Sequence, residues 1–190
     1  MCPITLIQSN NTEALYKYKG DHYLILYRET GINQKIMSRI FKQLESMQEI
    51  YSRVSVTFLQ FHLKKWSPEN KVMSAFLKSF KKILKREYNC KARYIWVREQ
   101  NGAPAQHYHM AILLSGHKCD NSYNIHKLAD TLWRSQNVFG YAYPVENAHY
   151  MVHRNKKDEF KAAIYRLAYL AKNYSKVFDK DINRFGVGRL

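Results

Sequence analysis

The chain of 190 residues is long enough to bury one sizeable hydrophobic core and short for two full domains. Hydrophobic residues make up 46% of it and aromatic residues 14%, which excludes a disordered tail and indicates a folded globular protein. Lysine and arginine number 31 against 15 aspartates and glutamates, so the formal net charge is +16. Because this charge is spread along the chain and mixed with tyrosines, it favours a nucleic acid partner over a merely basic protein.

The three cysteines, Cys2, Cys90 and Cys119, form no C-x-x-C pair. An odd number without such a pair favours reduced thiols in a cytoplasm over a disulfide scaffold. No apolar run approaches the roughly 20 residues that a membrane-spanning helix needs, and the N-terminus lacks the apolar core of a signal peptide. We therefore expect a cytoplasmic protein that makes no membrane contact.

The N-terminal part of the chain contains one clear element. Met1–Gly20 is polar and mixed, and we expect a loosely held lead-in. Tyr23–Tyr27 fits either a short edge strand or the start of a helix. In Asn33–Ile50, apolar residues recur at three- and four-residue spacing, which predicts an amphipathic helix.

A strand and a second helix follow. Tyr51–His62 alternates β-branched and aromatic residues with serine and threonine, which predicts a strand. Ser67 as a cap and Pro68 in the first turn then predict the start of a helix. One side of that helix is apolar, and lysines occupy much of the rest. A lysine-rich face is most often just solvated, and the alternative is an accessory contact to phosphates.

The centre of the chain, Arg93–Ser115, reads as two strands joined by the polar loop Gln100–Gln106. Downstream, Asn124–Ser135 predicts a helix, and Gly140–Val145 and Ala148–Val152 predict short strands. No repeat, low-complexity tract or linker divides the chain. The pattern therefore predicts a single α+β domain over residues 1–190 with an antiparallel sheet.

Two histidines open the second central strand, in the order His107-Tyr108-His109. Side chains alternate along a strand, so the two imidazoles point the same way and suit a divalent metal. If the intervening loop closes a hairpin, Glu99 comes close to them and could supply an oxygen ligand. The alternative is a pair of histidines on a solvated strand face.

A second informative stretch, Asp158–Lys176, predicts a helix. The stripe that packs consists of Phe160, Ile164, Leu167 and Ala171. Tyr165, Tyr169, Lys172 and Lys176 fall on another stripe, with the two tyrosines one turn apart. A lone tyrosine there would be an ordinary residue at the margin of the core. Beside a candidate metal site in a basic protein, the pattern has a chemical explanation.

That explanation is transesterification of a phosphodiester. A metal on the two histidines and Glu99 would neutralise and polarise the scissile phosphate. Tyr169 would attack it, which gives a covalent phosphotyrosine and a free 3′-hydroxyl. Lys172 would hold the phosphate or favour the phenolate. Tyr165, one turn away, would permit a second transfer.

These motifs resemble the HUH endonuclease superfamily of rolling-circle replication initiators. More closely, the stretch from about Arg53 to the C-terminus resembles the inovirus-type replication proteins and their prophage relatives, the YagK/YfjJ family, and residues 1–50 lie outside this likeness. The likeness is carried by YIWVREQ (Tyr94–Gln100), HYHMAILLS (His107–Ser115), YRLAYLAK (Tyr165–Lys172) and RFGVGR (Arg184–Arg189).

The resemblance implies an antiparallel sheet of about five strands flanked by helices, with the histidines on a central strand. It also implies an endonuclease of the bacterial cytoplasm that nicks single-stranded or melted origin DNA with Mg²⁺ or Mn²⁺, leaving a 5′-phosphotyrosine link. It supports Glu99 as the third ligand. Arg98, Arg166 and Lys176 lie near these motifs and are our candidates for contacts to nucleic acid.

The chain has no G-x-x-x-x-G-K phosphate loop followed by serine or threonine, so we expect a separate host helicase to unwind the nicked duplex. One alternative is a non-catalytic DNA-binding accessory or regulator of replication on the same fold. Another is a plasmid relaxase or single-strand transposase, which shares the chemistry. A zinc-stabilised structural domain is weaker, because closed zinc sites usually take four Cys/His ligands and no cysteine lies near the histidine pair.

Overall fold

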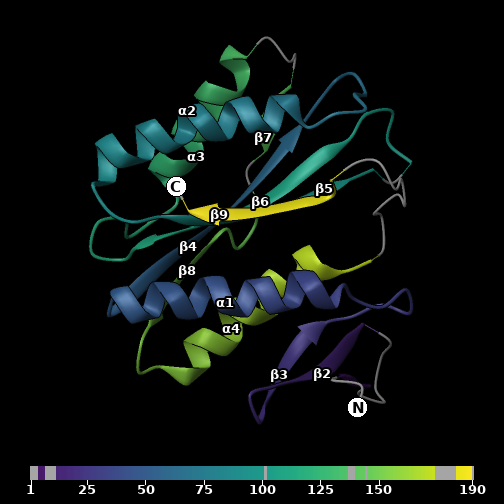
Figure 1. Cartoon of the computed structure of the whole chain (residues 1–190), viewed down its shortest axis with the longest axis vertical. Coiled ribbons are helices and arrows are strands. Elements are labelled where there is room, and N and C mark those ends of the chain that lie inside the picture. The colour runs from purple at the N-terminus through teal and green to yellow at the C-terminus, as the bar shows by residue number, and fades with distance from the viewer. Residues whose placement is uncertain are drawn as a thin grey trace.

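The computed structural model describes residues 4–6, 12–100, 102–136, 140–143, 145–173 and 183–189. Its centre is an antiparallel sheet between two layers of helices (Figure 1). Across the sheet the strands are β7 (Ala142–Tyr143), β4 (Arg53–His62), β6 (His107–Ser115), β5 (Arg93–Glu99) and β9 (Phe185–Arg189), and β8 (His149–His153) also pairs with β4.

Strands β7 and β8 share one edge of β4. β8 pairs with the segment Arg53–Thr57, and β7 pairs with Gln60 and Phe61 further along the same strand. The six strands therefore fill five positions across the sheet. This confirms the predicted α+β fold with an antiparallel sheet of about five strands flanked by helices.

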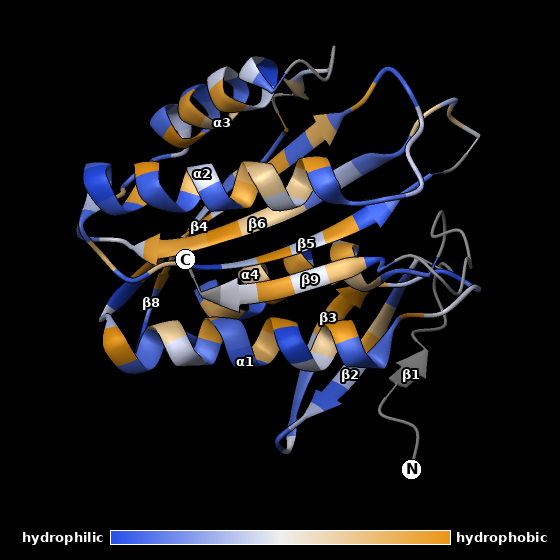
Figure 2. Ribbon diagram, turned by 45° about the horizontal axis from the view of Figure 1, so that its top comes forward, coloured by the Kyte–Doolittle hydropathy of each residue, from blue (hydrophilic) through white to orange (hydrophobic). Residues whose placement is uncertain are grey.

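Helices α1 (Gln34–Ile50) and α4 (Lys157–Ala168) cover one face of the sheet, and α2 (Lys71–Tyr88) and α3 (Tyr123–Ser135) cover the other (Figure 1). Alternation along β4 divides the core accordingly, since Phe58 packs in the α1 and α4 core while Phe61 packs in the other. Figure 2 shows β6 as hydrophobic along most of its length, as expected of a strand covered on both faces. None of the helices in the described part of the chain is long and apolar enough to cross a membrane.

A small second sheet precedes α1. It consists of β1 (Ile4–Leu6), β2 (Glu13–Tyr18) and β3 (Asp21–Leu26), paired in that order. The loosely held lead-in that we predicted up to Gly20 is therefore wrong for the described residues, and Tyr23–Tyr27 lies largely in a strand.

Packing against α1 explains why this sheet forms. The ring centroid of Phe41 in α1 lies 3.9 Å from that of Tyr18 and 4.9 Å from that of Tyr23. Tyr16 also stacks on Phe41, at 5.8 Å. The apolar surface that orders the sheet thus comes from a helix further along the chain, so the local pattern of polar residues gave no sign of it.

The starts of α1 and α2 can be compared with the predicted ones. Helix α1 begins directly after Asn33, whose side chain accepts a hydrogen bond from the backbone N–H of Ile36 at 3.1 Å. Helix α2 begins at Lys71 after Asn70, so the predicted start at Ser67 is wrong. Ser67 instead forms a turn, because its hydroxyl accepts a hydrogen bond from the backbone N–H of Glu69 at 3.2 Å.

Helix α4 ends at Ala168 and is followed by a single 3₁₀ turn, η1 (Tyr169–Ala171). Lys172 then has extended backbone angles, φ −59° and ψ 137°. The predicted helix over Asp158–Lys176 is therefore too long, and Lys172 does not continue the helical stripe of the tyrosines. Lys176 lies outside the described residues.

The segment before α1 is what ends this helix. Ile32 forms a β-bridge with Lys172, and the backbone N–H of Asn33 donates to the carbonyl of Ala171 at 2.7 Å. The backbone N–H of Asn173 donates to the carbonyl of Gly31 at 3.0 Å. Because this pairing requires extended chain after Ala171, it fixes the positions of Tyr169 and Lys172.

Replacement of Gly31 tests this pairing, and Gly20 provides a matched control. Both glycines have positive φ, 76° and 88°, and no heavy atom lies within 3.4 Å of a Cβ built on either. We expect Gly31→Ala and Gly20→Ala each to lower the free energy of unfolding in urea by about 1–2 kcal/mol. Only Gly31→Ala should also speed hydrogen exchange at the Asn173 amide, and equal exchange in the two variants would contradict the proposed role of the pairing.

Candidate active site

Strand register brings three potential metal ligands together. Glu99, the last residue of β5, lies opposite His107, the first residue of β6. The carboxylate Oε2 of Glu99 is 3.6 Å from Nε2 of His107 and 3.4 Å from Nε2 of His109. One ligand atom from each residue lies within 4.8 Å of the others. The predicted hairpin is confirmed, and so is the proximity of Glu99 to the histidines.

Burial makes this cluster unlike a surface ion pair. The side chains of Glu99, His107 and His109 are only 2%, 17% and 12% exposed. Burial by itself raises the pKa of Glu99, but its contacts with His107 and His109 outweigh this and hold the pKa well below its ordinary value. Burial also lowers the pKa of His109, against the opposing effect of Glu99, and so favours the neutral imidazole that binds metals.

The donor set fits a divalent cation. A carboxylate oxygen and two imidazole nitrogens are ligands that first-row divalent metals accept. Nε2 of His109 is buried, and its described polar neighbour is Oε2 of Glu99 at 3.4 Å, a contact that does not have the geometry of a hydrogen bond. A buried nitrogen of this kind ordinarily requires a partner, and a metal ion at the cluster would provide one.

Tyr169 lies directly beside this cluster. Its ring centroid is 5.0 Å from that of His109, and the two rings meet edge to face at 72°. Nζ of Lys172 lies 3.5 Å from the Tyr169 centroid, and the guanidinium carbon of Arg166 lies 5.6 Å from it. The structure therefore brings together the predicted tyrosine, lysine and candidate ligands, which come from β5, β6, η1 and the residue that follows η1.

Tyr165 has a different environment. Its hydroxyl donates a 2.6 Å hydrogen bond to Oε1 of Glu13 in β2. Burial and the Glu13 carboxylate raise the pKa of Tyr165 to about 12. This contact directs the hydroxyl toward the N-terminal sheet, so the structure does not join Tyr165 to Tyr169 in one polar cluster.

The two candidates for nucleic-acid contacts that lie in the described part of the chain also differ. Arg166 lies beside Tyr169, and its guanidinium carbon is 5.0 Å from the centroid of Phe58. Arg98 is buried, with 7% of its surface exposed, and donates hydrogen bonds to the backbone oxygens of Ser67 and Glu69. A buried guanidinium held by the loop before α2 indicates a structural role for Arg98, and its predicted contact to DNA stays a prediction.

Sequence reasoning missed a third histidine at the cluster. His62 in β4 lies opposite His107, and their rings stack with centroids 5.4 Å apart. Tyr141 stacks on the other side of His62 at 5.2 Å, and Nε2 of Gln60 lies 2.8 Å from Nε2 of His62. Burial, with His107 and His109 adding to it, lowers the pKa of His62. The sequence did contain a sign of this site: on this face of β4 the apolar Phe58 is followed by the polar Gln60 and His62.

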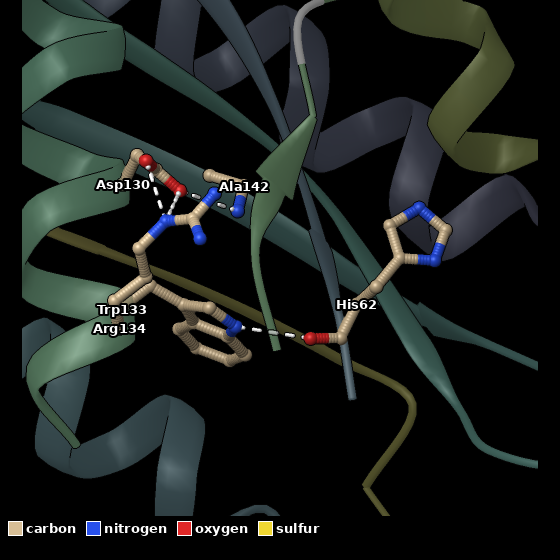
Figure 3. Close-up of polar contacts among 5 residues, drawn as sticks. All are labelled: His62, Asp130, Trp133, Arg134 and Ala142. Atoms are coloured by element: carbon tan, nitrogen blue, oxygen red, sulfur yellow. Dashed lines mark hydrogen bonds and ion pairs between the residues drawn. The ribbon is translucent and has the colours of Figure 1, made fainter. Parts of the chain in front are cut away.

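The backbone of His62 is fixed from the opposite face of the sheet (Figure 3). The indole Nε1 of Trp133 donates to the His62 carbonyl at 3.1 Å, while the imidazole points away from α3. Asp130 in the same helix accepts a hydrogen bond from the backbone N–H of Ala142 at 3.0 Å. Helix α3 thus positions both β4 and β7 behind the site.

The fold and the site define an α+β domain in which an antiparallel sheet carries a candidate metal centre beside a tyrosine. The chain belongs to the family of the YagK/YfjJ C-terminal domain, whose family model matches residues 17–188. Comparison with curated proteins and with solved structures found no match. The match includes β3 and α1, so the family likeness extends further toward the N-terminus than the stretch from Arg53 that suggested it.

Arg98→Ala tests the structural role of this residue. The guanidinium also donates to Oδ1 of Asn70 at 3.2 Å, and hydrogen bonds from a charged donor contribute about 1.5–3 kcal/mol. We expect a loss of that order in the free energy of unfolding, while Lys78→Ala, at an exposed position of α2, stays within about 0.5 kcal/mol of the wild type. Two results together would instead support a DNA contact by Arg98. The Arg98→Ala variant would be as stable as the wild type, and the slope of log binding constant against log salt concentration would fall by about one, as expected for the loss of one phosphate contact.

Proposed function

We propose that this chain is an endonuclease of the HUH type that initiates rolling-circle replication by nicking single-stranded or melted origin DNA. The observation that carries the proposal is the 5.0 Å contact between the rings of Tyr169 and His109, at a buried cluster of Glu99, His107 and His109. A nucleophile, cationic side chains and candidate ligands for a divalent metal meet there. A non-catalytic DNA-binding regulator would explain the +16 charge but not this arrangement.

In the proposed reaction the phenol oxygen of Tyr169 attacks the phosphorus in line and forms a phosphotyrosine bond. The phenol proton leaves to solvent, the bond from phosphorus to O3′ breaks, and O3′ takes up a proton to become the free 3′-hydroxyl. Lys172, with Nζ 3.5 Å from the Tyr169 ring, stabilises the phenolate and the charge that develops on the phosphoryl oxygens. Mg²⁺ or Mn²⁺ held by Glu99 and the two histidines would neutralise the scissile phosphate.

Tyr165 fits a later step better than the first nick. Its hydroxyl is bonded to Glu13 at 2.6 Å, so it must leave that carboxylate before it can attack a phosphate. A second transfer by Tyr165 would therefore first require this hydrogen bond to Glu13 to break.

Nicking of an origin requires a DNA substrate and a helicase partner. Single-stranded DNA is the proposed substrate, because an unpaired strand lets the scissile phosphate enter the cluster. The basic, tyrosine-rich chain also suits a single strand, whose backbone can contact lysines and arginines while its bases stack on aromatic rings. A separate host helicase would unwind the nicked duplex in the cytoplasm of the bacterial host.

The metal assignment is tested by variants of the cluster. We expect Mn²⁺ to raise the thermal midpoint of the wild type, because a ligand at 100 times its Kd adds about 2.7 kcal/mol of stability. Glu99→Gln and the double variant His107→Ala/His109→Ala should bind Mn²⁺ at least about tenfold more weakly and lose nicking. The exposed His117→Ala serves as the control and should behave as the wild type.

DNA affinity separates loss of metal from loss of the fold. The double variant should keep most of its affinity for single-stranded DNA, because basic side chains supply most of it. Full nicking by the double variant, or by the wild type in excess EDTA, would contradict the metal assignment.

The nucleophile is tested by trapping the covalent product. With a labelled single-stranded origin oligonucleotide and Mn²⁺, the wild type should give an adduct that resists SDS. Tyr169→Phe should abolish this adduct because it removes the attacking oxygen and keeps the ring. Tyr165→Phe is the matched control, and it should retain the first adduct while strand transfer falls. Mass spectrometry of the tryptic peptide should place the phosphotyrosine at Tyr169, and an adduct on Tyr165 alone would reverse the assignment.

A further inference from the structure

A cavity of ≈ 370 Å³ opens on the side of Tyr169 that faces the turn between β7 and β8. Its walls come from β4, β6, that turn, the end of α4 and η1, and they include Phe58, Gln60, His109, Glu146, Arg166 and Tyr169. Since His109 is a candidate metal ligand and Tyr169 the proposed nucleophile, a group bound here would be adjacent to the scissile phosphate.

Arg166 is held rigidly at this cavity. Its guanidinium carbon lies 5.0 Å from the Phe58 centroid and 5.6 Å from the Tyr169 centroid, and Nη2 donates to the carbonyl of Glu146 at 3.3 Å. Nε of Arg166 is buried and makes no hydrogen bond to any described residue. A guanidinium fixed in this way can offer its remaining donors to a ligand that has acceptor atoms.

The character of the walls distinguishes between two such ligands. A phosphate prefers several cationic groups or backbone N–H groups, whereas this cavity combines one guanidinium with the aromatic rings of Phe58 and Tyr169 and the amide of Gln60. Aromatic walls with a few polar groups are typical of pockets that receive an unstacked nucleobase. The volume is also within the range of small-molecule sites.

We propose that this cavity is a nucleobase pocket that reads a guanine next to the scissile phosphate, with Arg166 donating to its O6 and N7. Guanine is the base that presents two adjacent acceptors to an arginine fork. The inference rests on the proposed nicking function and adds sequence selection to it. The base would occupy the cavity while its phosphate lies at the cluster of Glu99, His107 and His109.

The experiment selects bound sequences from a randomised single-stranded DNA pool, with Tyr169→Phe as the parent protein. This parent keeps the aromatic wall and cannot form the adduct, so binding is measured without cleavage. We expect guanine to be enriched at one position. Arg166→Lys, which keeps the charge but loses the fork, should reduce that preference by about fivefold or more. Arg39→Lys, at an exposed position of α1, is the control and should leave the preference unchanged.

The outcomes separate the two proposals. In the wild type, the sequences at the nick should carry the same guanine beside the cut. If the protein nicks but no base preference depends on Arg166, the pocket is wrong and the nicking function stands. If guanine selection depends on Arg166 but no covalent adduct forms under any divalent metal, the nicking function is wrong and the pocket stands. An Arg166→Lys variant that keeps the full preference overturns the pocket in either case.

Discussion

The antiparallel register between β5 and β6 is the constraint on which the candidate site depends. A slip of one residue would move Glu99 to the opposite face of the sheet, away from both histidines. The residue between those histidines prevents such a slip, because Tyr108 is fully buried on the α2 side. Its ring meets Trp96 edge to face at 5.7 Å, and its hydroxyl donates to Oδ1 of Asn70 at 2.9 Å. Core packing on one face thus determines the ligand geometry on the other.

A second long-range contact determines the geometry of the tyrosine. The segment from Gly31 to Asn33 pairs with the chain after η1, so the helix cannot continue past Ala171. Lys172 consequently returns over the Tyr169 ring, where a helical lysine would lie one turn further along the axis. The close approach of cation and phenol is therefore a tertiary feature, which isolated helix periodicity would not produce.

The contrast between local and long-range contacts explains what the sequence could and could not predict. The strand that carries His107 and His109 was predictable, since alternation is local and both faces of that strand are buried. Glu99 followed from a hairpin, which is also a local connection. The end of α4, the strand β2 and the third histidine, His62, depend on partners far away in the chain, so no window around them contains the cause. The structural contacts of Arg98 were missed for the same reason, because the acceptors that it binds lie before α2.

The charges around Tyr169 also differ on its two sides. Glu99 forms an anionic, buried site for a cation, while Lys172 and Arg166 lie against the Tyr169 ring and favour an anion. A phosphodiester that bridges these regions would present oxygens to the candidate metal ligands and to Lys172 at once. Tyr165 lacks this setting, because Glu13 places a carboxylate at its hydroxyl, where a phosphate would be repelled. The electrostatic environment, more than the spacing in the sequence, therefore supports the choice of Tyr169 over Tyr165 as the proposed nucleophile.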